Sequence, residues 1–386
     1  MRILIGADIV PTRSNIDLFK SGDAKALIGD ELQSIFKQAD YRIFNLEVPL
    51  TEIETPIQKC GESLIAPVQS IEGLKAMNID LVTLSNNHIM DQGRQGLDST
   101  IRELEEAHIA HVGTGYTSDE ASKPYVFFCD GNKIGVYACT EHEFSVVNEK
   151  NPGANPIDLL ESFDHVYHLK QNCDFVIVLY HGGKEHYRYP SPNQQKICHK
   201  LVDKGADLVV CQHSHCIGLE EKYRQGTIVY GQGNFLFDGS NSEYWQTSLL
   251  IEIGDRFCIN YLPLKKEKNV VRLADSKTRR EILDDFFSRS CEIKEDGIVE
   301  KKYKEFANHY LTDFLSIASG KRYGIFIRAL NRICGNKIID ACIHRRYTKS
   351  KCLTLLNRIE CEANNELFIT GLRISLEGGK IENVNK

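Results

Sequence analysis

The sequence predicts an α/β protein with a largely parallel sheet. Short runs rich in β-branched residues recur through the first two thirds of the 386-residue chain, and amphipathic stretches of helical length lie between them. Apolar residues make up 42% of the chain, which is ordinary for a folded globular protein. We therefore expect one large α/β domain with a smaller appendage.

The apolar runs and amphipathic stretches give the expected elements in order. Strands are expected at 2–7, 41–44, 81–84, 133–138, 175–180, 208–211 and 227–230. Helices are expected at 30–39, 68–77, 97–106, 157–171 and 192–204. Two later runs, 248–253 and 257–262, flank a Gly-Asp pair whose turn chemistry predicts a hairpin.

The character of the sequence changes after about Lys265. From there the chain is charged and helical in pattern, and no clear strand is expected until its end. We therefore place a domain boundary at this point. It divides the chain into an α/β domain at 1–264 and a helical, partly basic region at 265–386.

Composition and charge narrow the classes of function. A net charge of −6 lacks the basicity of a general nucleic-acid binder. The first residues, MRILIGAD, leave no room for a signal peptide, and no segment approaches about 18 continuous apolar residues. Thirteen cysteines without a framework spacing fit a reducing compartment. We expect a cytoplasmic protein.

Polar side chains follow the expected strands where each strand ends. In open α/β sheets such groups gather in one crevice outside the carboxyl ends of the strands. Five strand ends contribute, and one Asp lies a turn beyond the third of them. The residues are Asp8; Asn45 and Glu47; Asn86, Asn87 and His88 with Asp91; His181 and Glu185; His213 and His215.

These residue types together suit a site for two divalent metal ions. Mn, Fe and Zn accept imidazole nitrogen and carboxylate oxygen, and a mixed set can hold two ions about 3.5–4 Å apart. Glu47, central among the strand ends, could bridge them. His213 and His215 would both face the crevice if their segment is extended, since alternate side chains then share one side.

Each motif also has a purely structural interpretation. Asn86, Asn87 and His88 could cap and turn the chain into the 97–106 helix, and Asp8 could cap a loop. Cys211 and Cys216 flank the histidine pair, but no second cysteine pair at zinc-ribbon spacing accompanies them. The GQGN segment precedes no helix of the dinucleotide-binding type. Joint placement at five strand ends favours the metal site.

Six stretches of the chain resemble the poly-gamma-glutamate capsule-synthesis family, called CapA-like. They are GAD, NLEVPLT, SNNHIMDQG, HGGKEHY, GADLVVCQHSHCIGLEE and IVYGQGNFLFD, and they fall within about residues 1–262. The resemblance implies the fold of calcineurin-type metallophosphoesterases. The expected fold is thus a two-sheet α/β sandwich flanked by helices, followed by a helical C-terminal segment.

The resemblance also implies roles for the strand-end residues. His88 would act as general acid or transition-state donor, and Asp91 and Glu185 complete the candidate catalytic set as orienting groups. Val10 stands where the broader pattern has a histidine ligand, so one ion is expected to be weakly held or absent. The implied metal contacts are Asp8, Glu47, Asn87, His181, His213 and His215, with Asn45 as an extra ligand.

The function this predicts is metal-dependent hydrolysis of a phosphoester, with metal-bound hydroxide as nucleophile. The resemblance implies a role in capsule or exopolymer production, on an anionic or phosphorylated small molecule or polymer. Two alternatives stay open: a non-catalytic metal-binding accessory protein of envelope polymer synthesis, and a metal-dependent amide hydrolase.

The segment 321–358 is strongly basic. It contains ten Lys or Arg residues against one acid, Asp340, and apolar residues are interleaved among them. Such a face could approach anionic lipid headgroups, an anionic polymer or nucleic acid, each through charge. Contact with a membrane surface would place the protein peripherally at the inner membrane face. The alternative is a solvated face docked beside the net-acidic remainder of the chain.

Overall fold

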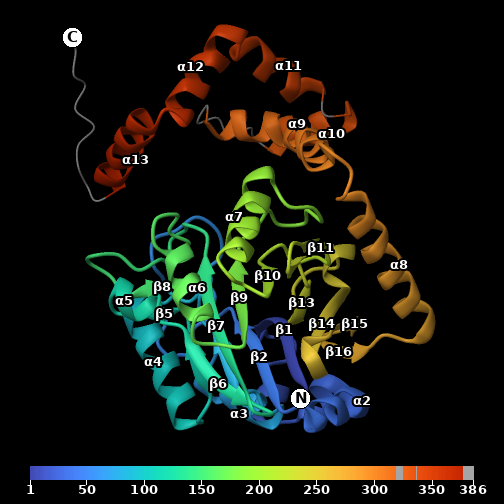
Figure 1. Cartoon of the computed structure of the whole chain (residues 1–386). Coiled ribbons are helices and arrows are strands. Elements are labelled where there is room, and N and C mark those ends of the chain that lie inside the picture. Colours follow the sequence, from blue (N-terminus) through green and yellow to red (C-terminus); the bar gives the residue numbers. More distant parts are fainter. Residues whose placement is uncertain (319–324, 336, 377–386) are drawn as a thin grey trace. The chain divides into compact units, whose positions relative to one another are not determined.

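Two β-sheets packed face to face form the centre of the first compact unit, Met1–Tyr303 (Figure 1). The computed structural model describes residues 1–318, 325–335 and 337–376. A second unit comprises Lys304–Lys386. The predicted α/β core of two sheets with flanking helices, and the helical C-terminal segment, are confirmed.

The first sheet has five strands in parallel pairing, β13, β1, β2, β3 and β4, and three strands in antiparallel pairing along one side. Its order is β16-β15-β14-β1-β2-β3-β4, and β13 pairs with the carboxyl end of β1. The strands are β1 (Ile3–Val10), β2 (Tyr41–Leu46), β3 (Leu81–Thr83), β4 (Ala110–Val112), β13 (Asn234–Phe237), β14 (Thr247–Ile253), β15 (Ile259–Glu267) and β16 (Val270–Leu273).

The second sheet also has a parallel centre, formed by β7, β9, β10 and β12. Its order is β11-β12-β10-β9-β7-β6, with β6 and β11 antiparallel at the edges. The strands are β6 (Tyr125–Cys129), β7 (Asn132–Thr140), β9 (Phe175–His181), β10 (Leu208–Gln212), β11 (Glu220–Tyr223) and β12 (Gly226–Tyr230). A separate pair joins β5 (Thr114–Gly115) and β8 (Gly153–Ala154).

The side chains of β1 point alternately into the apolar layers on the two faces of the first sheet. Ile3 and Ile5 pack into the core between the two sheets, whereas Leu4 packs into the core on the other face of the first sheet. Because successive side chains of a strand point to opposite faces, an unbroken apolar run places a strand between two apolar layers. Both faces of each sheet are therefore covered.

Helices cover the outer face of each sheet. Those on the first sheet are α2 (Ala24–Gln38), α3 (Ile71–Ala76) and α4 (Gly93–Glu106), and those on the second are α6 (Ser162–Lys170) and α7 (Pro192–Asp203). Short helices complete the loops: α1 (Ile16–Lys20), η1 (Val68–Ser70), α5 (Ser118–Ala121), η2 (Glu243–Trp245) and η3 (Asp255–Phe257).

The remaining helices follow the sheets in the chain. They are α8 (Ser276–Glu292), α9 (Ile298–Ala318), α10 (Ile325–Ile333), α11 (Lys337–Arg346), α12 (Lys349–Glu360) and α13 (Glu362–Leu376). Among the described helices, none has the length and apolar content needed to cross a bilayer.

The chain beyond Lys265 differs from the expectation. The predicted boundary at 264/265 falls inside β15, and β16 follows where no strand was expected. β16 is a four-residue edge strand whose partner is the charged end of β15, so it lacks the apolar signal of a central strand. Helix α8 then packs Ile282 and Phe286 into the core between the sheets. The first compact unit accordingly extends to Tyr303.

The predicted helix at 157–171 begins later than expected, at Ser162. The Asp158 carboxylate accepts hydrogen bonds from the backbone N–H groups of Leu160 and Glu161, and this turn competes with a helical start. Leu159 and Leu160 are consequently exposed instead of lying on a buried helix face. The hairpin of β14 and β15 is confirmed, with η3 as its connection.

Candidate metal centre

Two buried glutamines hold the candidate site together by joining the two sheets at its rim. Gln212, which ends β10, donates from Nε2 to the carbonyl oxygen of Gly6 in β1, at 3.2 Å. Gln232, after β12, donates to the carbonyl oxygen of Ile5 at 2.9 Å. The carboxyl ends of β1, β2, β9 and β10 therefore meet, as expected for α/β sheets whose ligands lie at strand ends.

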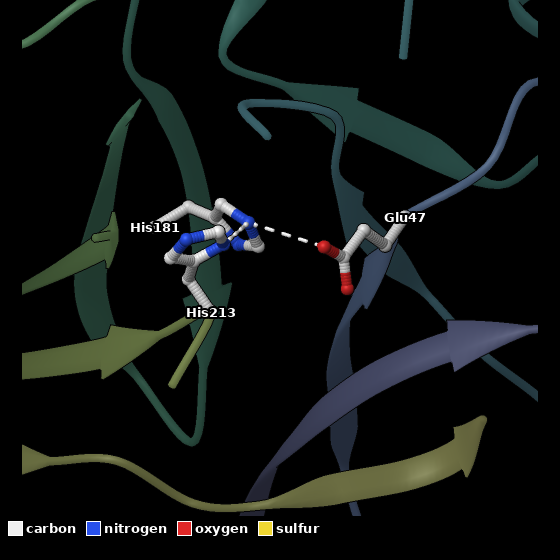
Figure 2. A group of neighbouring side chains, drawn as sticks. All are labelled: Glu47, His181 and His213. Atoms are coloured by element: carbon white, nitrogen blue, oxygen red, sulfur yellow. Dashed lines mark hydrogen bonds and ion pairs between the residues drawn. The ribbon is translucent and has the colours of Figure 1, made fainter. Parts of the chain in front are cut away.

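Two groups of side chains lie close enough to hold metal ions. Glu47, His181 and His213 form one group, and Asp8, Glu47 and His215 form the other. Within each group the candidate ligand atoms lie within 4.8 Å of one another, and every residue is buried. Glu47 belongs to both, as the expected bridging position requires. Figure 2 shows the imidazoles of His181 and His213 facing the Glu47 carboxylate.

The carboxylates of this centre lack the partners that buried acids normally have. Oδ2 of Asp8 and both carboxylate oxygens of Glu47 are buried and accept no hydrogen bond. Their imidazole neighbours stand at 3.5 Å for His215 Nδ1 to Asp8 and 3.3 Å for His181 Nε2 to Glu47. Burying a carboxylate is costly unless it is paired or binds a metal. The donor set therefore fits divalent cations.

The imidazole of His181 lies at the centre of the first group. Its Nε2 is 2.9 Å from Oδ1 of Asn87 and 3.1 Å from Nδ1 of His213. The amide oxygen of Asn87 thus faces the same point as Glu47 and the two histidines. One carboxylate, one amide oxygen and two imidazoles make a mixed oxygen and nitrogen set of the kind that Mn, Fe and Zn accept.

Burial and mutual charge perturb every titratable ligand. Burial raises the pKa of Asp8, and the charge of Glu47 raises it further. Burial also acts to raise the pKa of Glu47, but its contacts with His181 bring it well below the usual range. Burial and the neighbouring imidazoles lower the pKa of His213, whereas the Asp8 and Glu47 carboxylates outweigh burial and raise the pKa of His215 to about 9. A bound dication would stabilise the carboxylates directly.

A chain of amides orients Asp8. Nδ2 of Asn45 donates to Oδ1 of Asp8 at 2.8 Å, and Oδ1 of Asn45 accepts from Nδ2 of Asn86 at 2.9 Å. The oxygen through which Asn45 could bind a metal is therefore committed to Asn86. The geometry favours an orienting role for Asn45 over the predicted role as an extra ligand. Such hydrogen bonds fix the ligands they contact.

His88 stands beside the ligands in a chain of three charged or polar groups. Its Nδ1 is 2.6 Å from Oδ2 of Asp91, and Oδ1 of Asp91 accepts from the ammonium of Lys59 at 2.6 Å. The side chains of Asp91 and Lys59 are 0% and 3% exposed, so water does not screen this pair. The carboxylate orients the His88 ring, and the ammonium holds the carboxylate.

The predicted extended conformation of the His213–His215 segment is wrong, although both rings reach the site. His213 and His215 adopt left-handed backbone conformations, with φ of 83° and 52°. Such conformations cost about 1–3 kcal/mol in non-glycine residues and are retained where surrounding structure enforces them. Val10 packs in the apolar core of the first sheet, so the second group consists of three acid or imidazole ligands.

Some residues of the site were not expected, and one expected residue lies apart. Glu185 is exposed on the segment after β9, outside both ligand groups. Glu143 approaches the site from the loop after β7, with Oε2 at 3.4 Å from Nδ2 of Asn87 and Oε1 at 3.9 Å from Nε2 of His213. Lys59 lies on a loop that follows no expected strand. Glu143 lies in the loop beyond the expected strand 133–138, but not directly at its end, so the strand-end pattern could not find either residue.

Comparison with known proteins places the chain in a family. Residues 2–239 match the family described as Bacterial capsule synthesis protein PGA_cap. The chain belongs to this family. The matched region contains every predicted ligand and catalytic residue of the PGA_cap chain, and it ends before the helices that follow β16.

Relatives of this PGA_cap protein include two capsule-associated proteins. "Capsule biosynthesis protein CapA" of Bacillus anthracis is 31% identical over 211 residues, which cover 52% of this chain and 51% of the relative. "PGA biosynthesis protein CapA" of Bacillus subtilis is 30% identical over 211 residues, covering 54% and 56%. The chain thus spans about half the length of these relatives. Among solved structures, a phosphatase from Mycoplasma pneumoniae aligns at a TM-score of 0.44 and 15% identity, covering 69% of this chain and 94% of its own.

Proposed function

We propose that this PGA_cap protein is a metal-dependent phosphoesterase-like hydrolase that acts on an anionic or phosphorylated compound in capsule or exopolymer production. One observation carries the proposal: two ligand groups share the buried carboxylate of Glu47, whose oxygens accept no hydrogen bond and whose nearest imidazole is that of His181 at 3.3 Å, and His88 stands beside them. Family membership supplies the capsule context. Thirteen cysteines without a disulfide are consistent with action in the cytoplasm.

The ligand residues would hold two divalent ions, such as Mn, Fe or Zn. Glu47, Asn87, His181 and His213 would hold one ion. Asp8, Glu47 and His215 would hold the other, more weakly because Val10 provides no ligand atom. Such ions supply Lewis acidity toward a phosphoryl group and lower the pKa of water.

The chain's own contribution to the reaction is proton transfer and orientation. His88 would donate its proton to the departing oxygen, or a hydrogen bond to the charge that develops at phosphorus. Its Nδ1 is held by Asp91, so Nε2 is the atom available to the substrate. Lys59 neutralises Asp91 and so favours one orientation of the carboxylate and of the ring it holds.

The test separates metal binding from turnover. Purified protein is assayed for bound metal and for manganese-dependent cleavage of an aryl phosphodiester, together with His213→Ala and His88→Ala. His213→Ala should lose metal and turnover. His88→Ala should keep metal and lose about 100-fold or more in kcat, the usual contribution of a general acid. The exposed His108 offers a control, since His108→Ala should change neither quantity.

One observation favours a second candidate, a non-catalytic accessory protein of envelope polymer synthesis. Val10 leaves the second group with only three acid or imidazole ligands, which weakens the two-ion arrangement that hydrolysis needs. Stoichiometric metal without cleavage of phosphomonoester, phosphodiester or glutamyl amide substrates would favour this role. Cleavage that is lost in both histidine variants would exclude it.

A further inference from the structure

Three helices of the second unit expose apolar side chains at every third position. Large apolar residues scattered singly on a surface are normal, but repeated stripes are uncommon in soluble proteins. A spacing of three residues places side chains along one face of a helix. The exposed fractions are Leu311 46%, Phe314 58% and Ile317 75% in α9; Ile327 46%, Leu330 56% and Ile333 82% in α10; Leu353 56%, Leu356 47% and Ile359 53% in α12.

Basic side chains accompany these stripes. Eight Lys or Arg residues between 325 and 358 are exposed, against the single acid Asp340 in that range. Lys321 and Arg322, which belong to the same basic run in the sequence, lie outside the described residues. The eight are Arg328, Arg332, Lys337, Arg345, Arg346, Lys349, Lys351 and Arg358.

We infer that the apolar stripes and basic side chains of α9 to α12 form a binding surface for an anionic lipid bilayer. Leu330, Ile333 and Leu356 would enter the boundary between headgroups and acyl chains, while Arg345 and Arg346 contact the headgroups. Amphipathic helices with apolar and basic faces bind in this way, with an affinity set jointly by buried apolar area and by charge.

Charge distinguishes the bilayer from the other occupants. A second copy of the chain would bring an equally basic surface against this one, and like charges oppose that contact. A nucleic acid or anionic polymer would satisfy the arginines but would leave nine large apolar side chains in water. An anionic bilayer provides negative charge and apolar depth together.

The test is vesicle flotation with the full chain. Vesicles of phosphatidylglycerol mixed with phosphatidylcholine are compared with phosphatidylcholine alone, at low and high salt. The chain should bind the anionic vesicles, and high salt should weaken binding because it screens exposed charges. Arg345→Glu with Arg346→Glu should reduce binding at least about tenfold, since each basic residue near the surface contributes to the attraction.

Substitutions of apolar residues test whether the apolar stripes contribute to bilayer binding. Leu353→Asn with Leu356→Asn should reduce binding to anionic vesicles by a similar factor, because less apolar area enters the bilayer. Two substitutions in the first unit serve as matched controls. Leu160→Asn changes an apolar residue that is 85% exposed, and Arg94→Glu reverses the charge of a side chain that is 70% exposed. Both controls should bind as the parent does.

Three results would overturn the inference. The first is no binding of the parent chain to anionic vesicles. The second is unchanged binding in both double variants, with circular dichroism equal to that of the parent. The third is a dimer in solution that Leu353→Asn with Leu356→Asn dissolves, which would assign the apolar stripes to a second copy. None of these readouts depends on hydrolytic activity, so failure here leaves the proposed function untouched.

Discussion

His215 is the ligand whose protonation competes most directly with a metal ion. Burial alone would lower the pKa of this imidazole, but the carboxylates of Asp8 and Glu47 raise it to about 9. Below that pH the metal-free imidazole is protonated, and a metal can bind only by displacing the proton. Metal affinity should therefore fall as the pH decreases from 9 to 6, by up to about tenfold per unit.

Calorimetry checks this dependence. Titration of manganese at pH 7, in two buffers with different ionisation enthalpies, should show that about one proton is released for each ion that His215 accepts. His215→Gln should abolish most of the release while leaving the group of Glu47, His181 and His213 in place. Proton uptake, or affinity that is constant between pH 6 and 9, would contradict the assignment of His215 as a ligand.

Lys59 should be far more important for stability than its position on a loop suggests. Its ammonium and the Asp91 carboxylate are buried together, so Lys59→Met leaves an uncompensated negative charge. Breaking a buried pair in this way typically costs about 3–5 kcal/mol. Asp91 keeps two other partners, Nδ1 of His88 and the N–H of Leu64, so we expect a loss of about 3 kcal/mol, at the lower end of this range. Denaturant unfolding of metal-free protein measures it.

The chain offers a matched control for this prediction. Lys25 and Asp30 also form an ion pair, with N···O of 3.1 Å, but their side chains are 69% and 71% exposed. Lys25→Met should change the free energy of unfolding by less than about 0.5 kcal/mol, because water screens an exposed pair. Adding Asp91→Asn to Lys59→Met should restore part of the loss. Equal effects of the two lysine variants would refute a buried role for Lys59.

How far the site could be predicted from sequence follows from where its residues lie. Asp8, Glu47, His181, His213 and His215 come at the ends of apolar runs, so the strand pattern marks them. Other contributors reach the site only through tertiary folding of loops. Lys59 and Glu143 lie in such loops, and no local pattern distinguishes them from other surface charges.

At the scale of elements, the parallel centres of both sheets were predictable and the edges were not. Strands such as β9 and β10 are buried on both faces and appear as continuous apolar runs. β11 and β16 lie at sheet edges and carry charged residues, which is how proteins protect an edge but also removes the apolar signal. β4 is as short as β3, but its sequence Ala-His-Val lacks the apolar run that marks β3 as a strand.

Helix α4 ends in a turn that the sequence does not favour. The N–H of Ile109 donates to the carbonyl oxygen of Leu104, and the N–H of His108 donates to that of Glu105, which together form a Schellman motif. His108 has φ of 57°, where glycine is the preferred residue. His108→Gly should therefore stabilise the protein by up to about 1 kcal/mol.

The neighbouring position provides the control for this helix end. Ala107 has φ of −81°, an ordinary right-handed conformation, so Ala107→Gly should destabilise by about 0.5–1 kcal/mol. Asn78 ends α3 in the same motif with φ of 54°, and asparagine tolerates this conformation better than histidine. Asn78→Gly should therefore gain less than His108→Gly. Destabilisation by His108→Gly would contradict the argument.

At the scale of the molecule, the candidate metal centre lies across the junction of the two sheets. Asp8 and Glu47 come from the first sheet, whereas His181, His213 and His215 come from the second. Without a cation, the buried carboxylates have few partners, and the left-handed histidines store strain. A metal ion would therefore join the sheets as well as supply chemistry, because it binds the folded arrangement and not the separated strands.

Hydrogen exchange with and without manganese should reveal this coupling. Bound ions stabilise the native state by about 2.7 kcal/mol when present at 100 times their dissociation constant, which slows exchange wherever opening requires the site to separate. Protection should rise in β1, β2, β9 and β10 together, and remain unchanged in α10 and α12, which hold no residue of either ligand group. His213→Ala should remove most of the gain. If protection rose in one sheet alone, the ion would be bound by that sheet, and the centre that spans both would be wrong.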